Sequence, residues 1–371
     1  MELTAAAANY TMAAPGGVAV HRKHAVIRRT REYRAARRSI RAGFPTEEVS
    51  MSEVWLAALA AMAGFAGLVW SADRFVAGSA ALARQLGLSR LVIGLTIVSL
   101  GTSAPEIMVA ISAGMRGAGE LAVGNALGSN LANIGLVLGA TALIAPLPAQ
   151  RHLLGQEIPL LLVVTALAGF MLRDARLTLV ESLVLLGLLV PLLWLTVHYK
   201  KRHHSGKEDD VEIRDYTRIR AAGWFLLGLA ALLASSEILV WGAQRLAVAA
   251  GVSPLVIGLT VVAIGTSLPE LAASIASALR GHYDLALGNI IGSNVFNILA
   301  VMSVPGIIHT VEMEDAVFSR DYLAMLALTL LLVAAISASL WRRPVGARLG
   351  RRLGALLLAC YGGYYWLLFH H

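Results

Sequence analysis

Cysteine and charged residues are scarce in this sequence. There is one cysteine, Cys360, so no disulfide can form within the chain, and its place in an apolar segment predicts a packing role. Only 15% of the residues are charged. No apolar core follows the basic residues near the N-terminus, which excludes a secretory signal peptide.

Apolar residues dominate what remains. The 371 residues are 57% hydrophobic with a mean hydropathy of +0.69, and the apolar runs are too many and too long for a soluble core. The net charge of +8 could indicate a nucleic-acid partner, but 9 of the 31 Lys and Arg residues precede position 50 and most others lie between apolar runs. Orientation in a lipid bilayer explains this pattern better than nucleic-acid binding.

Residues 1–50 form a basic N-terminal extension that matches neither half of the chain described below. Two interpretations stay open: an arginine-rich, transit-like segment or basic tail, or translation that begins at Met51, directly before the first apolar run. We assign it no function and expect a chain starting at Met51 to behave like the full one. Its arginines include Arg28, Arg29, Arg31, Arg34, Arg37, Arg38 and Arg41.

The apolar runs divide into two sets of five, each run near the length of a membrane-spanning helix. The sequence therefore predicts an all-α polytopic membrane protein with ten transmembrane helices. The first set (51–199) has runs at 54–72, 91–115, 120–145, 153–172 and 177–199, and a charged loop follows at 200–220. The second set (221–371) has runs at 221–241, 253–279, 284–308, 321–341 and 350–369.

The two sets are copies of one module. The stretch Gly94–Glu106 (GLTIVSLGTSAPE) recurs 164 residues later as Gly258–Glu270 (GLTVVAIGTSLPE), and 25 of 48 positions are identical between 91–138 and 255–302. Because each copy has an odd number of spans, the second must enter the membrane in the opposite direction. The result is a pair of inverted repeats, an architecture typical of transporters.

Basic residues near the helix ends predict the orientation. With the 200–220 loop in the cytoplasm, most arginines flanking the helices lie there too, and the positive-inside rule then places both termini outside. An arginine-rich tail outside the cytoplasm would contradict the positive-inside rule. This is a second reason to doubt that residues 1–50 are part of the translated protein. The arginines left outside are Arg116, Arg173, Arg176, Arg245 and Arg320.

Each copy places a proline and a glutamate in an apolar run, Pro105–Glu106 and Pro269–Glu270. A carboxylate at membrane depth costs at least about 2.5 kcal/mol, so such residues are usually functional. The motif GTSxPE and the following GNxxGSNxxN gather oxygen atoms without cysteine or histidine, which favours Na⁺, Ca²⁺ or another hard cation. The candidate ligands are Glu106, Glu270, Thr102, Ser103, Ser129, Asn133, Thr266, Ser267, Ser293 and Asn297.

Local geometry supports such a site. The interval of four residues from Ser129 to Asn133, and from Ser293 to Asn297, puts a hydroxyl and an amide on one helix face. The prolines free carbonyl groups one turn upstream. Motif glycines let helices approach closely. Close packing alone, without a direct role in the site, is the favoured explanation of Gly124, Gly128, Gly288 and Gly292.

Other polar residues have simpler explanations. Hydroxyl groups often bond their own helix, and Asn125, Asn130, Asn289 and Asn294 could satisfy interrupted backbone groups. Asp73 and Glu237, with Arg74 and Arg245 nearby, are typical of interfacial ion pairs and stay outside the site. His152, His198, His203, His204 and His282 fall in loops or at helix ends, where we expect a solvated surface.

The paired motifs GTSAPE with GNALGSNLAN, and GTSLPE with GNIIGSNVFN, resemble the two alpha repeats of the cation/calcium antiporter superfamily, which includes sodium/calcium and calcium/proton exchangers. The resemblance covers residues 54–369. It implies ten helices with Glu106 and Glu270 as central ligands facing each other at the bilayer midplane. By the same match, the backbone carbonyls of Ser99 and Ala263 are outer ligands.

The expected function is a bacterial-type inner-membrane antiporter that extrudes Ca²⁺ in exchange for Na⁺ or H⁺ by alternating access, with no cofactor and no enzymatic activity. In sodium-coupled relatives the position of Asn297 is typically an aspartate, so the coupling ion stays open. An intramembrane hydrolase is a remote alternative, because no histidine or lysine is placed to activate a buried serine. A cation channel is another alternative, and it would be distinguished from an antiporter by ion flux that needs no countergradient. The sequence does not indicate an oligomeric state.

Overall fold

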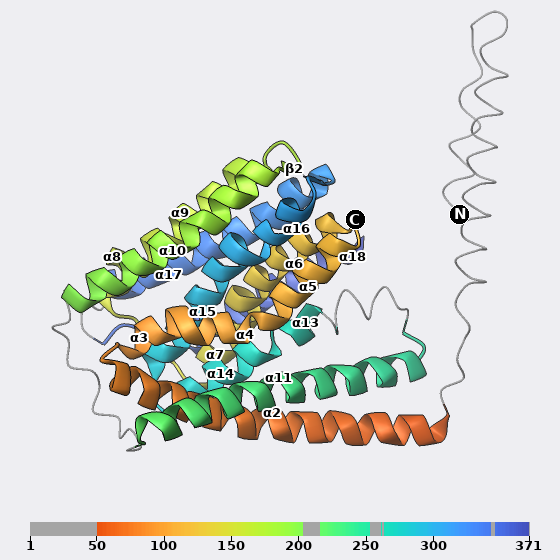
Figure 1. Ribbon diagram of the computed structural model, residues 1–371, viewed down its shortest axis with the longest axis horizontal. Helices are drawn as coiled ribbons and strands as arrows, with labels where there is room; N and C mark the ends of the chain where they lie inside the picture. Colours follow the sequence, from red (N-terminus) through yellow and green to blue (C-terminus); the bar gives the residue numbers. More distant parts are fainter. Residues whose placement is uncertain (1–49, 203–215, 253–260, 262, 343–345, 371) are drawn as a thin grey trace, which may run out of the picture. The chain divides into compact units, whose positions relative to one another are not determined.

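The structure, a computed structural model, describes residues 50–202, 216–252, 261, 263–342 and 346–370. The basic extension at 1–49 lies outside the described residues. The described part is helical apart from four two-residue strands (Figure 1).

The first half comprises α2 (Met51–Leu86), a segment broken into α3 (Arg90–Ile93), the π-helical turn η1 (Gly94–Val98), α4 (Ser99–Thr102) and α5 (Ala104–Met115), then α6 (Gly119–Ala132), η2 (Asn133–Leu138) and α7 (Gly139–Ile144). It continues with β1 (Leu147–Pro148), α8 (Arg151–Gly155), α9 (Glu157–Leu172), β2 (Arg176–Leu177) and α10 (Leu179–Arg202).

The second half follows the same order. It comprises α11 (Arg218–Ala249), α13 (Ala263–Thr266), α14 (Leu268–Leu279), α15 (Tyr283–Phe296), η4 (Asn297–Val301), α16 (Ser303–Ile308), β3 (Val311–Glu312), η5 (Val317–Tyr322), α17 (Leu323–Arg342), β4 (Arg348–Leu349) and α18 (Arg351–His370). Most of the segment expected to begin this half's second run, 253–260 and 262, lies outside the described residues.

Seven of the described helical segments are long and apolar enough to cross a membrane, and the pair 90–102 and 104–115, bent by 46°, would be an eighth. Their outward surfaces carry large apolar side chains such as Trp55, Phe65 and Trp194, all exposed. Contiguous exposed apolar surface of this kind is stable only in an apolar environment.

The helices differ in length from the sequence expectation. The first and sixth were expected to span 54–72 and 221–241, but α2 has 36 residues and α11 has 32. A capping box explains where α2 begins: the Ser50 hydroxyl accepts from the Glu53 amide, and the Glu53 carboxylate accepts from the Ser50 amide. Gly87, at φ 64°, ends it in the left-handed conformation that favours glycine.

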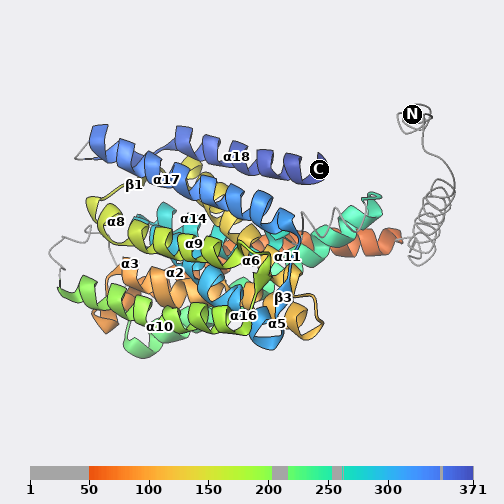
Figure 2. The same ribbon diagram turned by 90° about the horizontal axis from the view of Figure 1, so that it is seen from above.

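Helices α2 and α11 pack along each other, as both views show (Figures 1 and 2). Glycines allow their backbones to approach, and these contacts occur in pairs related by the 164-residue shift. A Cβ atom at Gly64 would lie 2.5 Å from the Leu239 amide nitrogen, and one at Gly228 would lie 2.6 Å from that of Phe75. Gly78 meets Phe225 and Gly242 meets Ala61 in the same reciprocal way.

The core of the bundle is formed by α6 and α15, whose side chains are mostly buried. Each leads into a π-helical turn that begins at an asparagine, Asn133 in η2 and Asn297 in η4. A π-helical turn inside a helix is uncommon and often marks a functional site, because the wider turn redirects side chains and backbone groups.

Two short strand pairs mark opposite ends of the bundle. Strand β1 pairs with β4, and β2 pairs with β3, so each pair joins the two halves of the chain. Near β1–β4, Gln150 contacts Asp284 at 3.4 Å. Near β2–β3, the Glu314 amide donates to Glu120 at 2.7 Å. We refer to these as the β1–β4 end and the β2–β3 end.

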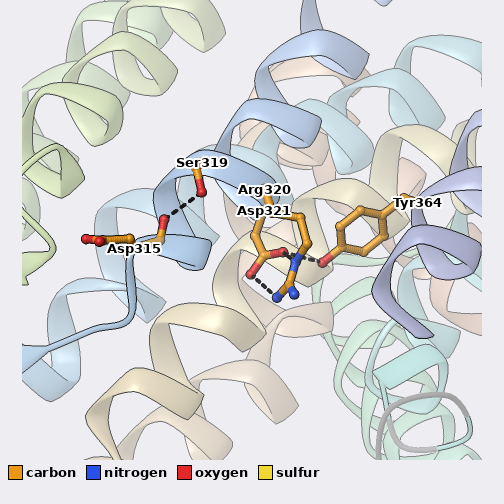
Figure 3. Close-up of polar contacts among 5 residues, drawn as sticks. All are labelled: Asp315, Ser319, Arg320, Asp321 and Tyr364. Atoms are coloured by element: carbon orange, nitrogen blue, oxygen red, sulfur yellow. Dashed lines mark hydrogen bonds and ion pairs between the residues drawn. The ribbon is translucent and has the colours of Figure 1, made fainter. Parts of the chain in front are cut away.

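Helix α18 lies beside α17 (Figure 2), and a buried carboxylate, Asp321 in η5, contacts it. Asp321 pairs with Arg320, whose Nε donates at 2.6 Å, and accepts a 3.1 Å hydrogen bond from the Tyr364 hydroxyl on α18 (Figure 3). The Ser319 hydroxyl bonds the Asp315 carbonyl oxygen in the same turn (Figure 3). The hydrogen bond from Tyr364 attaches α18, and all of these residues lie outside the repeated motifs described above.

Candidate functional site

The two motif glutamates occupy equivalent positions. Glu106 lies in the first turn of α5 and Glu270 in the first turn of α14, each directly after a proline at the start of the helix. Proline fits this position because the first helical residues have no backbone acceptor for an N–H group. Both carboxylates are 1% exposed and close enough to interact electrostatically.

Glu270 is surrounded by hydroxyl groups from both halves. The Ser103 hydroxyl donates to Glu270 Oε1 at 3.0 Å, and the Ser293 hydroxyl lies 3.5 Å from the same atom. Thr102 is a further polar neighbour. Glu106 has the matching neighbours, Ser129 from its own half and Thr266 from the other. Each carboxylate therefore sits where the two halves meet.

Several buried oxygens in this cluster have no hydrogen-bond partner among the described residues. They are Glu106 Oε2, Glu270 Oε2, the amide oxygens of Asn133 and Asn297, and the Ser267 hydroxyl. Leaving a buried acceptor unpaired costs about 1–3 kcal/mol, and more for a charged group. Unpaired buried oxygens of the repeated motifs, two of them carboxylate oxygens, are therefore suited to a hard cation, which would satisfy such acceptors.

The structure thus brings the ten motif residues of the predicted site into the centre of the bundle, nine of them buried and Thr266 partly buried. The two backbone carbonyl groups expected as outer ligands are a different case from the motif side chains. The Ser99 carbonyl already accepts from the Ser103 amide at 2.9 Å and from the Thr102 hydroxyl at 3.3 Å, so it is not free in this conformation. Ala263 is the first residue of α13, and its proposed role stays a prediction. No group of three His, Cys, Asp or Glu side chains that could hold a metal occurs among the described residues.

Of the other motif asparagines, Asn130 and Asn294 support the backbone as expected, whereas the Asn125 amide nitrogen has no partner among the described residues. Asn130 donates to the Asn294 carbonyl at 3.3 Å, and Asn294 donates to the Ile290 carbonyl at 2.7 Å. Asn289 does more: its amide group donates to the Glu270 carbonyl oxygen and to the Ser274 hydroxyl, and its oxygen accepts from Thr102. Sequence reasoning did not single out this role, although the asparagine belongs to the repeated motif.

Motif glycines allow the close packing that the sequence predicted. A Cβ atom at Gly288 would lie 2.6 Å from the Leu91 carbonyl oxygen, and one at Gly292 would lie 2.5 Å from the Ser99 hydroxyl. Gly101 and Gly265 are similarly restricted by side chains of α11. No atom of the described residues lies within 4 Å of a Cβ placed at Gly124 or Gly128. The counterparts of the residues that Gly288 meets, at 255, 258 and 259, lie outside the described residues, so close packing there stays a prediction.

A cavity of about 800 Å³ lies between α5 and α11 and reaches the edge of the site. Its wall near the site includes Pro105, Gly265 and Thr266, and Arg116 lies toward the β2–β3 end. Polar residues along the cavity, which sequence reasoning did not place in the site, are Ser112, Ser236, Glu237 and Gln244.

Two titratable residues have surroundings that the sequence did not predict. An interfacial ion pair was expected for Asp73, with Arg74 nearby. Asp73 does form an ion pair, but its partner is Arg280, whose Nε lies 2.6 Å from Asp73 Oδ1, while Arg74 lies over the Trp70 and Trp224 rings. His282 was expected on a solvated surface, but it is only 4% exposed. Burial, reinforced by the charges of Arg90 and Arg280, lowers its pKa to about 4.

Comparison with known proteins decides the family. Residues 56–197 and 220–370 match the family described as sodium/calcium exchanger protein. The chain belongs to the sodium/calcium exchanger family. It is a multi-pass membrane protein, and its relatives in the family are transporters and not enzymes.

Individual relatives match nearly their whole length. The candidate antiporter CaxA of Alkalimonas amylolytica is 46% identical over 322 residues, which cover 85% of this chain and 99% of CaxA. The inner membrane protein YrbG of Escherichia coli is 38% identical, covering 84% of this chain and 98% of YrbG. The solved structure of the sodium-calcium exchanger NCX_Mj soaked in 10 mM Na⁺ superposes with a TM-score of 0.71 at 32% identity, covering 83% of this chain and 97% of that one.

Proposed function

We propose that this exchanger extrudes Ca²⁺ across the inner membrane in exchange for Na⁺ or H⁺ by alternating access. The observation that carries the proposal is the pair of buried carboxylates, Glu106 and Glu270, each with an unpaired oxygen beside further unpaired amide and hydroxyl oxygens. Two adjacent carboxylates in a low-dielectric site need compensating positive charge. One Ca²⁺ or two monovalent cations supply it, so the ions compete for one site and exchange follows from that competition.

The proposed ligands are the side-chain oxygens of the motif residues. The two carboxylates are central, and hydroxyl groups complete the set together with the amide oxygens of Asn133 and Asn297. Ser99 is retained only through a rearrangement that would free its carbonyl group, because both of its acceptor positions are used here. The hydroxyl ligands are Thr102, Ser103, Ser129, Thr266, Ser267 and Ser293, and the Ala263 carbonyl is the remaining outer candidate.

We infer that the chain forms ten transmembrane helices as two inverted repeats, 51–199 and 221–371. Reciprocal contacts support this: the Gly64–Leu239 contact becomes Gly228–Phe75 when each residue is exchanged for its counterpart 164 positions away. The strand pairs support it as well, because β1 and β3 are counterparts by the same shift and each pairs with a strand of the other half.

The proposed orientation places the β1–β4 end in the cytoplasm and both chain termini outside. Loops expected in the cytoplasm by the positive-inside rule contribute Gln150 and Asp284, which meet at this end, and the loops expected outside meet at β2–β3. The cavity between α5 and α11 lies toward the β2–β3 end. In this orientation the described conformation is open to the outside.

The test is ⁴⁵Ca²⁺ flux into vesicles reconstituted with the purified protein, with Na⁺ and H⁺ gradients imposed separately. Uptake driven by only one of the two gradients identifies the coupling ion. Vesicles without protein, and vesicles with the Glu106→Gln variant, are the controls. Ca²⁺ uptake that proceeds equally without any countergradient would contradict exchange and favour a channel.

A further inference from the structure

Four charged residues make up two sets, each of one arginine and one carboxylate, and a shift of 164 positions converts one set into the other. Asp73 on α2 pairs with Arg280, the residue that ends α14. Their counterparts in the other half are Glu237 on α11 and Arg116, the residue that ends α5. Each arginine is the C-cap of a helix whose first turn carries a site glutamate, so each arginine–carboxylate set relates a site helix to one of the two long helices.

The two pairs are in different states. Arg280 and Asp73 are in direct contact, with side chains 25% and 44% exposed. Arg116 and Glu237 are exposed and line the 800 Å³ cavity between α5 and α11. Within the described parts of the chain, neither of these two side chains has an ion pair or a hydrogen bond.

Packing around the pairs follows the same difference. Beside the closed pair, Ala72, Val76 and Ala273 are buried in a hydrophobic cluster that joins α2 to α14. Shifting these positions by 164 residues gives Ser236, Val240 and Val109, and all three line the cavity instead. One half of the molecule is therefore closed at the interface that the other half leaves open.

We propose that the pairs Asp73–Arg280 and Glu237–Arg116 are two gates that close alternately. In the described conformation the first holds α14 against α2 and seals the β1–β4 side. In the opposite conformation α5 closes on α11, Arg116 pairs with Glu237, and the Asp73–Arg280 pair opens. This assignment rests on the proposed exchange by alternating access and adds the residues that hold each state.

The chemistry suits a reversible gate. Both pairs consist of an arginine and a carboxylate, so the ion pair that breaks at one side is replaced by one of the same kind at the other. Ion pairs near the surface are worth less than about 1 kcal/mol, so either can break within a transport cycle. Arginine also offers two parallel donors, which holds a carboxylate in a defined orientation.

Cysteine labelling separates the two states. With Cys360→Ala removing the native thiol, Ser112→Cys places a reporter on the cavity wall, where a maleimide reaches it only when the cavity is open. In detergent, Asp73→Asn should slow labelling roughly two- to fivefold, the change expected from losing one ion pair. Glu237→Gln should leave labelling at least as fast, and both variants should slow ⁴⁵Ca²⁺ exchange in vesicles.

Matched variants test whether charge pairing is the cause. Exchanging the charges with Asp73→Arg and Arg280→Asp should restore the labelling rate, and Arg173→Ala, a loop arginine stacked on Phe170, should leave it unchanged. The opposite state is tested with Arg116→Cys and Glu237→Cys together. A short bis-methanethiosulfonate reagent, which spans the gap that the two long side chains leave, should cross-link them through two disulfides and stop exchange, and a reductant should restore it.

The outcomes distinguish this inference from the proposed function. Labelling that shifts in the same direction for Asp73→Asn and Glu237→Gln, or in neither, would overturn the gates, as would an absence of cross-linking in protein that exchanges Ca²⁺ normally. Wild-type vesicles that show no Ca²⁺ exchange would instead overturn the proposed function. Opposite labelling shifts in such protein would still support two charge-gated states.

Discussion

The Thr102 hydroxyl donates a 3.1 Å hydrogen bond to the amide oxygen of Asn289, although 187 positions separate the two residues. Asn289 in turn donates to the Glu270 carbonyl oxygen at 3.4 Å and to the Ser274 hydroxyl at 3.1 Å. A single buried amide thus joins the end of α4, just before one site helix, to the first turns of the other. The relative position of the two glutamates depends on this contact between halves.

Replacing Asn289 with leucine, which has a similar volume, should lower the free energy of unfolding by about 1–3 kcal/mol, because it leaves buried polar groups without partners. Ca²⁺ exchange should fall as well. The measurement is the thermal midpoint in detergent together with ⁴⁵Ca²⁺ flux. Asn125→Leu, at the position matched by the 164-residue shift, is the control, because the Asn125 amide nitrogen has no partner among the described residues. Equal losses in both variants would show that the network is not the cause.

Adding one methyl group at Gly292 should disrupt the contact between α15 and the η1–α4 segment. The Cβ atom of Gly292→Ala would lie 2.5 Å from the Ser99 hydroxyl and 2.7 Å from the Leu95 carbonyl oxygen, so the helices must separate. Overpacking of this kind typically costs about 1–3 kcal/mol. Thermal unfolding compares this variant with Gly187→Ala in α10, where no described atom lies within 4 Å of the new Cβ. An unchanged midpoint for Gly292→Ala would contradict the close packing.

The repeat explains why the centre of the molecule was predictable. Duplication marked Glu106 and Glu270 as functional because a buried carboxylate is costly and two copies of it are hard to explain otherwise. Helical periodicity then placed Ser129 beside Asn133, and both are buried in the structure.

Contacts between distant segments were not predictable in the same way. Asp73 has Arg74 beside it in the sequence, yet it pairs with Arg280, because α14 packs against α2 in the folded chain. The repeat does show that Arg116 and Arg280 occupy equivalent positions. Nothing in the sequence, however, shows which of the two arginines is paired with its carboxylate. The buried state of His282 depends likewise on neighbours from other helices.

Neutralising either site glutamate should abolish exchange without preventing insertion. In Glu106→Gln or Glu270→Gln, one carboxylate remains to balance a divalent ion in a low-dielectric site, and losing one partner of a buried charge set costs about 3–5 kcal/mol. The Ca²⁺ exchange rate should therefore fall roughly 100-fold or more. Glu120→Gln, at the β2–β3 end, is the matched control. Transport at the wild-type rate in either site variant would end the central-site proposal.

Stability should fall as the pH drops from 6.5 toward 4, because His282 is buried as the neutral form. Its pKa is lowered to about 4 by burial and by the charges of Arg90 and Arg280, so between these pH values the unfolded chain binds a proton that the folded chain does not. His282→Gln removes this contribution and should flatten the decline. The thermal midpoints of the two proteins are compared at about pH 7.5, above this window, and at about pH 5.5 and 4.5, within it. Parallel curves for variant and wild type would disprove the assignment.

The stoichiometry should be one Ca²⁺ for two monovalent ions, and the reason lies in Asn133 and Asn297. Both amides are buried in the site, and an amide can coordinate a cation through oxygen but can neither ionise nor carry a proton. The site therefore supplies at most two negative charges, from Glu106 and Glu270. One Ca²⁺, two Na⁺ or two protons leave it near neutrality, whereas three Na⁺ would bury a net positive charge at considerable cost.

Exchange in that ratio moves no net charge, so the wild-type ⁴⁵Ca²⁺ flux should not respond to an imposed membrane potential. Asn297→Asp adds a carboxylate that must be protonated or paired in every occluded state, so it should strengthen cation binding at high pH and make exchange more dependent on pH. Asn297→Ser, which retains an oxygen ligand without a charge, is the control and should keep the wild-type pH profile. A wild-type rate that rises steeply with potential, with more than two monovalent ions moved per Ca²⁺, would show that charge neutrality of the two glutamates does not set the coupling.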